Sequence, residues 1–206
     1  MAGPHENLEH MEHAEHASHS GSKKIALLIS VLALFLALSE MLGKSAQTQA
    51  ITDNVKANDT WAFFQAKTIR MAVLTTAGEQ LQIQAEKATD ADTKTRLEKR
   101  IDEWKKTVER YDDDPKSNEG RKQLMATARA LEHSREVAMS RYHNYEFASA
   151  AFQIGIVLAS AEVITNMIAL GWLSGFMGLA GLAFMGIGLW APNALDFLTH
   201  AGAAAH

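Results

Sequence analysis

Three apolar segments, each long enough to cross a lipid bilayer, constrain this chain more than any other feature. They occupy residues 25–42, 147–168 and 170–191, and almost no connector separates the last two. A helix needs about 20 largely apolar residues to span the hydrocarbon core. Trp172 and Trp190 bracket the third segment about 27 Å apart along a helix, which suits the two aromatic belts of a membrane. The pattern predicts three transmembrane helices, the last two in a tight hairpin.

Two other interpretations compete with this one. The first segment could be a cleaved signal peptide, but it is long for a signal core, contains Glu40, and has Lys44 where a cleavage site needs a small residue. All three segments could be core helices of a soluble protein, but 206 residues leave too little polar sequence to cover them. Retained spans are the better prediction.

Residues 45–146 are mostly polar and carry helical patterns throughout. Apolar or small residues recur every three or four positions, a spacing typical of helices that pack as coiled coils or bundles. The first set is Ile51, Val55, Ala62, Ala66, Ile69, Val73, Ala77, Leu81 and Ala85; the second is Leu97, Ile101, Trp104, Val108 and Tyr111; the third is Leu124, Ala128, Leu131, Ala138, Tyr142, Tyr145 and Phe152.

The sequence also indicates where two of the helices begin. The sequence TDAD at residues 89–92 offers an N-cap to the middle helix, and Asp114 followed by Pro115 predicts the start of the next one. Neither outer helix has a break where it meets its span, so we expect both to continue into the membrane.

The predicted fold is an all-α membrane protein with three transmembrane helices and a long helical coiled-coil or bundle stalk between spans 1 and 2. The expected divisions are a His/Glu-rich N-terminal tail (1–24), span 1 (25–42), the stalk (43–146), span 2 (147–168), span 3 (169–192) and a C-terminal tail (193–206).

Basic residues flank the spans unequally. Those near the membrane on the stalk side are Lys44, Lys56, Arg129, Arg135 and Arg141. The opposite side has Lys23 and Lys24 beside four acids. The positive-inside rule therefore predicts a cytoplasmic stalk and an N-terminal tail on the periplasmic face.

The N-terminal tail repeats Glu-His and ends in a further histidine; the candidate metal ligands are His10, His13, His16 and His19. A three-residue step on a helix keeps neighbouring histidines on one face, so a pair could bind Zn²⁺ or another divalent transition metal. Protonation near pH 6.5 would instead suit a pH sensor. The third interpretation is a solvated leader with no cofactor.

Glu40 and Glu162 are the ionisable residues within the spans. An intramembrane carboxylate is by default a candidate functional residue, because burying its charge is costly. Lys44 follows Glu40 by four positions and can pair with it. Glu162 has no local cation and must face water, a partner helix or an inward-reaching Lys24, or be protonated.

Two further clusters indicate contacts between helices or subunits. Small residues in span 3, including Gly171, Gly175 and Gly178, permit close helix approach within the hairpin or between chains. Trp61, Phe63 and Phe64 crowd one helical turn and cannot all face one seam, which favours a subunit interface.

Composition excludes several classes of chemistry. The chain has no cysteine, so thiol nucleophiles, disulfides and thiolate metal sites are absent. With 20 basic and 24 acidic residues, it offers no field for nucleic acid. No phosphate-binding loop, dinucleotide fingerprint, catalytic triad or zinc-hydrolase motif occurs, so we expect no enzyme activity.

The Glu-His tail, KKIALLISVLALFLALSE, GKSAQTQA, WAFFQAKTIR and the late pair of apolar runs together resemble an uncharacterised bacterial membrane-protein family, known as a domain of unknown function. The resemblance covers essentially the whole chain. It implies a protein of the bacterial inner membrane and supplies no catalytic residues.

The sequence therefore predicts a non-enzymatic, homo-oligomeric scaffold or organiser anchored in the bilayer, with an unidentified cytoplasmic protein as a further candidate partner. One alternative is an ion channel or transport component that uses Glu162. The other is a metal-binding or pH-sensing module that uses the histidine tail.

Overall fold

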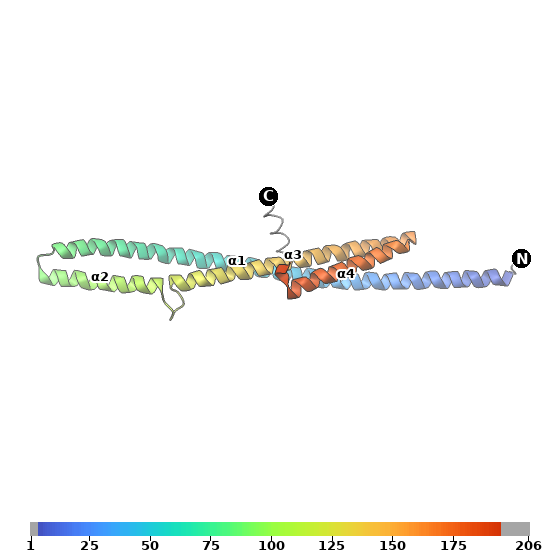
Figure 1. Cartoon of the computed structure of the whole chain (residues 1–206), viewed down its shortest axis with the longest axis horizontal. Coiled ribbons are helices and arrows are strands. Elements are labelled where there is room, and N and C mark those ends of the chain that lie inside the picture. Colours follow the sequence, from blue (N-terminus) through green and yellow to red (C-terminus); the bar gives the residue numbers. More distant parts are fainter. Residues whose placement is uncertain (1–3, 195–206) are drawn as a thin grey trace. The chain divides into compact units, whose positions relative to one another are not determined.

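The computed structural model describes the backbone of residues 4–194 and the side chains of residues 23–194. This part of the chain is all-helical (Figure 1): α1 (Pro4–Lys87), α2 (Ala91–Asp112), α3 (Arg121–Thr165), α4 (Ile168–Trp190) and the short 3-10 helix η1 (Pro192–Ala194). The chain divides into an apolar unit, residues 1–49 and 137–206, and a polar unit, residues 50–136. The predicted all-α class is confirmed.

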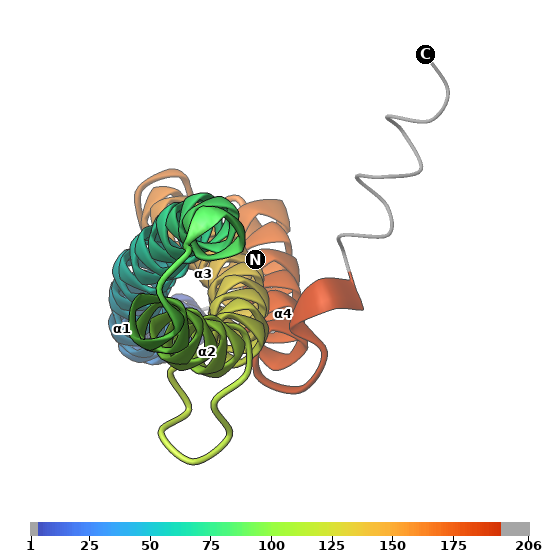
Figure 2. The same cartoon turned by 90° about the vertical axis from the view of Figure 1, so that its left-hand side faces the viewer.

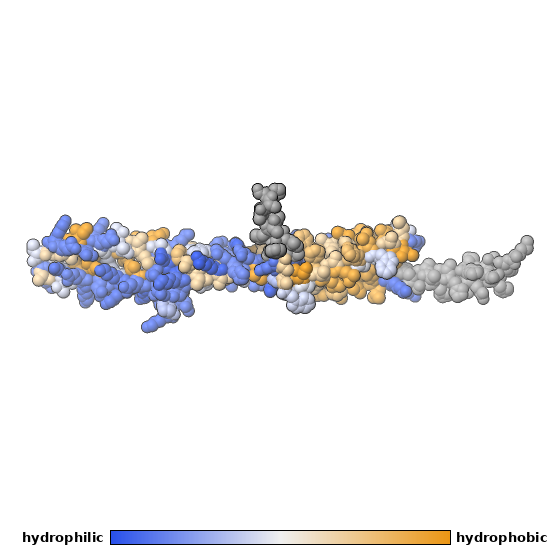
Figure 3. All heavy atoms as spheres, in the orientation of Figure 1, coloured by the Kyte–Doolittle hydropathy of each residue, from blue (hydrophilic) through white to orange (hydrophobic). Residues whose placement is uncertain are grey.

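Three helices are long and apolar enough to cross a membrane, as the sequence predicted. They are α4 and the helices α1 and α3, each of which contributes its apolar part to the apolar unit. Hydrophobic residues dominate the surface around α4 and the end of α3, whereas the polar unit is largely hydrophilic with smaller hydrophobic areas (Figure 3). The expectation that the outer helices continue unbroken into their spans is also confirmed.

In the apolar unit, α3 and α4 form the predicted tight hairpin. Asn166 adopts a left-handed conformation (φ 55°) and its N–H donates to the Glu162 carbonyl at 2.8 Å, which ends α3. Asparagine tolerates this conformation better than most residues with a side chain. Met167 is the N-cap residue of α4, so only Asn166 and Met167 separate the two helices.

Small residues bring α4 close to its neighbours. Ser174, Gly178, Gly181 and Gly188 are the buried residues of α4, and they recur at heptad spacing. A Cβ at Gly181 would lie 2.6 Å from the Phe152 ring, and one at Gly178 would lie 2.8 Å from Leu32. Close packing of this kind supplies van der Waals attraction between the helices, which is the main attraction between helices that lie in a membrane.

The centre of the apolar unit joins all three of its helices. Leu32 of α1 packs with Ala148 and Phe152 of α3 in the buried cluster, and the Phe35 ring stacks on Phe152 at 5.9 Å between centroids. Two buried hydroxyls add polar links: Ser39 donates to the Tyr145 carbonyl at 2.9 Å, and Ser174 of α4 donates to the Gly155 carbonyl at 2.7 Å.

In the polar unit, α1 and α2 run side by side (Figures 1 and 2). Residues 74–82 of α1 face residues 101–109 of α2, and Asp53, earlier in α1, contacts Ser134 of α3, which comes later in the chain. The segment formed by α2 and the start of α3 therefore runs antiparallel to α1. The heptads predicted for α2 and α3 are confirmed, because their apolar members are buried or half-buried.

The predicted seam of α1 is wrong over most of its length. Ile51, Val55, Ile69 and Val73 are exposed, and the face that packs within the unit lies on about the opposite side of the helix. Its buried and half-buried members are Ala50, Asp53, Ala57, Thr60, Phe64, Lys67, Met71, Leu74, Gly78, Leu81 and Ala85. The larger apolar residues misled the prediction, because small and paired polar side chains form much of the true contact: the Ser134 hydroxyl donates to Asp53 at 2.7 Å.

The boundaries of α2 and α3 differ in how well they were predicted. Asp90 caps α2, accepting the Thr93 N–H at 2.8 Å, as expected. The predicted helix start at Pro115 is wrong. Asp114 accepts the Ser117 N–H at 3.2 Å, but Asn118 then turns left-handed (φ 57°), so this turn ends and α3 begins only at Arg121.

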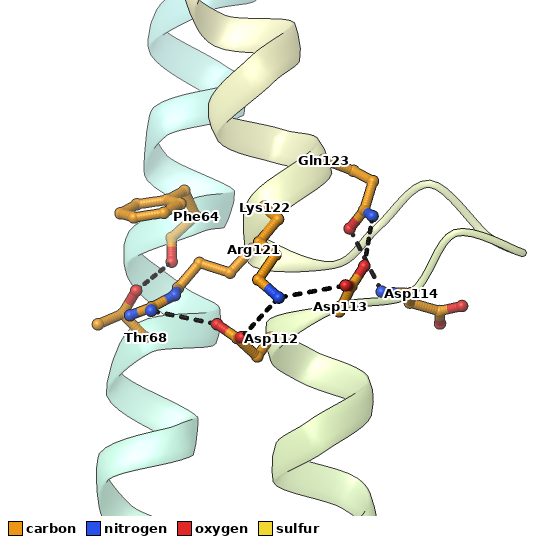
Figure 4. Close-up of polar contacts among 8 residues, drawn as sticks. All are labelled: Phe64, Thr68, Asp112, Asp113, Asp114, Arg121, Lys122 and Gln123. Carbon is orange, nitrogen blue, oxygen red and sulfur yellow. Dashed lines mark hydrogen bonds and ion pairs between the residues drawn. The ribbon is translucent and has the colours of Figure 1, made fainter.

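A polar network holds the α2–α3 connection (Figure 4). Arg121 pairs with Asp112 at 3.1 Å, and the Lys122 ammonium reaches both Asp112 and Asp113. The Gln123 amide donates to Asp113 at 2.6 Å. The Gln123 hydrogen bond, with the Lys122 hydrogen bond and charge behind it, lowers the pKa of Asp113 below its ordinary value of 3.8.

We predict that substituting Gly181 by Ala destabilises the apolar unit, because the new methyl group meets a Phe152 ring that is fully buried and stacked. Overpacking of this kind should lower the Tm by about 3–10 °C. Gly175→Ala is the matched control, since a Cβ there meets nothing within 4 Å. Thermal unfolding followed by tryptophan fluorescence in nanodiscs measures both; equal Tm values would contradict the packing described here.

We also predict acid weakening of the α2–α3 connection through Asp113. Its native pKa is lowered, so its contribution is complete above the ordinary pKa of 3.8 and disappears as pH falls through the native pKa. Hydrogen exchange of residues 112–121 should show faster opening at pH 2 than at pH 5. In Asp113→Asn that pH difference should shrink; an unchanged difference would assign it to other carboxylates.

Candidate functional site

The predicted metal ligands His10, His13, His16 and His19 lie outside the residues whose side chains the structure describes. Within residues 23–194, no three His, Asp or Glu side chains lie together as a metal site would require. Metal binding by the tail therefore stays a prediction.

Glu162 lines an open groove on the apolar unit. The groove has a volume of about 620 Å³ and is formed by the start of the α1 span, the end of α3 and the first half of α4. Lys24 and Glu162 are its two charged lining residues, and the walls include Leu28, Trp172, Gly175, Phe176 and Leu179. Of the alternatives that the sequence left for Glu162 (water, a partner helix, an inward-reaching Lys24 or protonation), Lys24 shares this lining, although among the described residues the two form no ion pair.

Gly171 makes room for the Glu162 carboxyl group. A Cβ at position 171 would lie 2.6 Å from Cδ and 2.8 Å from Oε1 of Glu162, so any side chain there would displace the carboxylate. Gly171 lies in the first turn of α4, whose N-cap residue, Met167, makes no side-chain capping bond. The positive end of the α4 dipole lies at this turn and favours a negative charge, whereas Glu162 itself stands in the last turn of α3, where the negative end of that dipole opposes one.

The Glu162 side chain is half-buried, yet among the described residues no side chain forms an ion pair or hydrogen bond with it. This combination was not visible in the sequence, because it requires the register of the α3–α4 hairpin.

Glu40, the carboxylate in the first apolar segment, behaves differently. The predicted pair with Lys44 does not form among the described residues. Glu40 Oε1 instead accepts a long hydrogen bond from the Gln153 amide of α3 at 3.5 Å. The side chain is exposed, so Lys44 and Glu40 are both free to extend outward rather than toward each other.

The exposed apolar stripe is the most conspicuous feature of the polar unit. Among its described residues, every large exposed hydrophobic side chain belongs to α1: Ile51, Val55, Phe63, Ile69, Val73 and Ile83. Ile69 and Val73 are 64% and 61% exposed. We use the name α1 stripe for Ile51, Val55, Ile69 and Val73, which share one face of the helix about opposite the packed seam.

The aromatic cluster on α1 divides between the interior and the surface. Trp61 is half-buried and donates its indole N–H to Glu132 of α3 at 2.8 Å, and its ring meets Phe64 edge-on at 5.3 Å. Phe63 remains 38% exposed. Trp61 and Phe64 thus contact helices of their own chain, and a role in a subunit interface stays a prediction for all three.

The glycines predicted at an interface occupy different environments. Gly178 is buried against Leu32, and the half-buried Gly171 lies against Glu162, so both serve packing within the chain. A Cβ added at Gly175 would meet nothing within 4 Å, and this glycine lines the groove. Contacts of these glycines with a second chain stay a prediction.

Lys67 was missed by sequence reasoning. Its side chain is buried in the polar unit, with the ammonium 3.7 Å from Glu119 and about 5 Å above the rings of Phe63 and Tyr111. Cation–π attraction and the ion pair offset its loss of water. The available signal was its heptad position, three residues after Phe64.

Comparison with known proteins identifies a family rather than an individual relative. No curated protein and no solved structure matches this chain. The sequence profile of DUF4337, described as a domain of unknown function, matches residues 21–191. That range includes the whole polar unit, most of the apolar unit, the groove and the α1 stripe. The chain therefore belongs to the DUF4337 family, as its resemblance in sequence suggested.

Proposed function

We propose that this protein is a homo-oligomeric scaffold of the bacterial inner membrane, without enzyme activity, that self-associates through the α1 stripe. The polar unit is cytoplasmic in this proposal, and the N-terminal tail is periplasmic. The observation that carries it is the concentration of exposed apolar side chains on one helix of an otherwise hydrophilic unit.

Burial explains why the stripe favours association. An apolar side chain the size of valine or isoleucine contributes about 1.5–3 kcal/mol when it is fully removed from water. The four stripe residues extend over about 33 Å of helix, from Ile51 to Val73. A single chain leaves them in solvent, since α2 and α3 occupy the other face of α1.

Membrane anchoring sets the geometry of the contact. Copies inserted in one bilayer share the same orientation, so neighbouring α1 helices run parallel. In a parallel symmetric pair, each residue of the interface lies opposite the same residue of the other copy. The α1 stripe would then form a coiled-coil-like seam, with Ile69 near Ile69 and Val73 near Val73.

We predict that the double substitution Ile69→Gln and Val73→Gln reduces the number of subunits per particle while leaving helix content unchanged. Both positions are exposed in the single chain, so its own packing does not depend on them. Native mass spectrometry in nanodiscs would measure the subunit number. The control, Lys99→Gln with Glu103→Gln, places two glutamines on an exposed face of α2. Equal subunit numbers in both variants would contradict the proposal.

We further predict that a single cysteine at position 69 forms a disulfide between copies. The natural chain has no cysteine, so no background crosslink exists. A parallel seam brings identical positions within the Cα separation of about 4.4–6.8 Å that a disulfide requires. Mild oxidation of membranes, followed by non-reducing electrophoresis, should give a dimer for Ile69→Cys and none for Lys99→Cys. A dimer for both would indicate random collision.

A further inference from the structure

The groove beside Glu162 combines features that free protein surfaces rarely share. It is apolar along most of its wall, open on one side, and belongs to three helices that are suited to a bilayer. Its volume of about 620 Å³ falls in the range of small-molecule binding sites. Because the spans lie in lipid, the molecules that meet this groove first are phospholipids.

The two charges of the groove are complementary to one class of headgroup. Lys24 offers an ammonium group that attracts phosphate, and Glu162 offers a carboxylate that accepts hydrogen bonds. A zwitterionic phospholipid with a primary ammonium group carries both matching charges close together in one headgroup. A headgroup without an amine leaves Glu162 unpaired, and a quaternary ammonium cannot donate hydrogen bonds to it.

The position of each group in the chain suits this orientation. Lys24 immediately precedes the first apolar segment, and Glu162 lies three residues before α3 ends at Thr165. Both therefore lie near the same end of their spans, where headgroups occur, and the exposed Trp172 beside them is an interfacial residue type. Leu28, Phe176 and Leu179 continue the groove as an apolar wall.

We propose that this groove binds one phospholipid with a primary-ammonium headgroup, its phosphate on Lys24, its ammonium on Glu162 and an acyl chain along Leu28, Phe176 and Leu179. Gly171 holds the space for the carboxylate, and Gly175 leaves the floor of the groove open. Glu162 is thus compensated by a lipid rather than by another residue of its own chain. This site goes beyond the proposed scaffold role and does not depend on the α1 stripe.

The test is native mass spectrometry of the full-length protein, delipidated and then titrated with phosphatidylethanolamine, phosphatidylcholine or phosphatidylglycerol of identical acyl chains. We expect one phosphatidylethanolamine per chain, bound about tenfold more tightly than the other two lipids, the value of one charge-assisted hydrogen bond. Glu162→Gln should abolish this preference, and Lys24→Gln should weaken the binding of all three lipids. Glu40→Gln, the same change at the other intramembrane carboxylate, should alter neither.

Filling the groove provides a second, independent measurement. Gly175→Leu places a side chain where the structure has open space, so the fold should persist while the bound lipid is lost. If Gly175→Leu instead lowers the subunit number and leaves lipid binding intact, the groove holds a second copy of the chain and the proposal is overturned. It is equally overturned if Glu162→Gln retains the wild-type preference for phosphatidylethanolamine.

Discussion

The close approach of α4 to α3 and α1 is the contact on which the apolar unit depends. Gly178 receives Leu32, Gly181 receives the Phe152 ring, and Ser174 bonds the Gly155 carbonyl. Larger residues at these positions would separate the helices and lose the dispersion contacts that hold them. The same register places Gly171 opposite Glu162, so the hairpin that stabilises the unit also builds its groove.

The polar unit is held together by different interactions. Its register depends on polar pairs at seam positions, such as Asp53 with Ser134, and on Lys67 between aromatic rings and Glu119. Buried polar pairs tolerate few alternative registers, because a shift would leave them unsatisfied. Some larger apolar residues of α1, those of the α1 stripe, are left outside this seam, and their exposure is the observation behind the proposed self-association.

Periodicity and length predicted the helices, the three that are long and apolar enough to cross a membrane, and the seams of α2 and α3, because each of these depends on local sequence. The seam of α1 could not be predicted in the same way. There, alanine, aspartate and lysine occupy much of the packed face, and only their partner residues show that the polar ones are satisfied. The start of α3 was predicted wrongly for a related reason: Asp114 and Pro115 begin a turn that ends at Asn118. Glu162 was identified from the sequence as a candidate functional residue, but the groove that it lines could be found only from the packing of α1, α3 and α4.

The close contact between the Glu162 carboxyl group and Gly171 has a consequence for related sequences. A methyl group at position 171 and a carboxylate at position 162 compete for the same space. Because the atoms that compete are the far end of a flexible, half-buried side chain, a methyl group at 171 would turn the carboxylate away from the start of α4 rather than exclude the acid. A homologue with a side chain at 171 would therefore present the same acid from a different place in the groove.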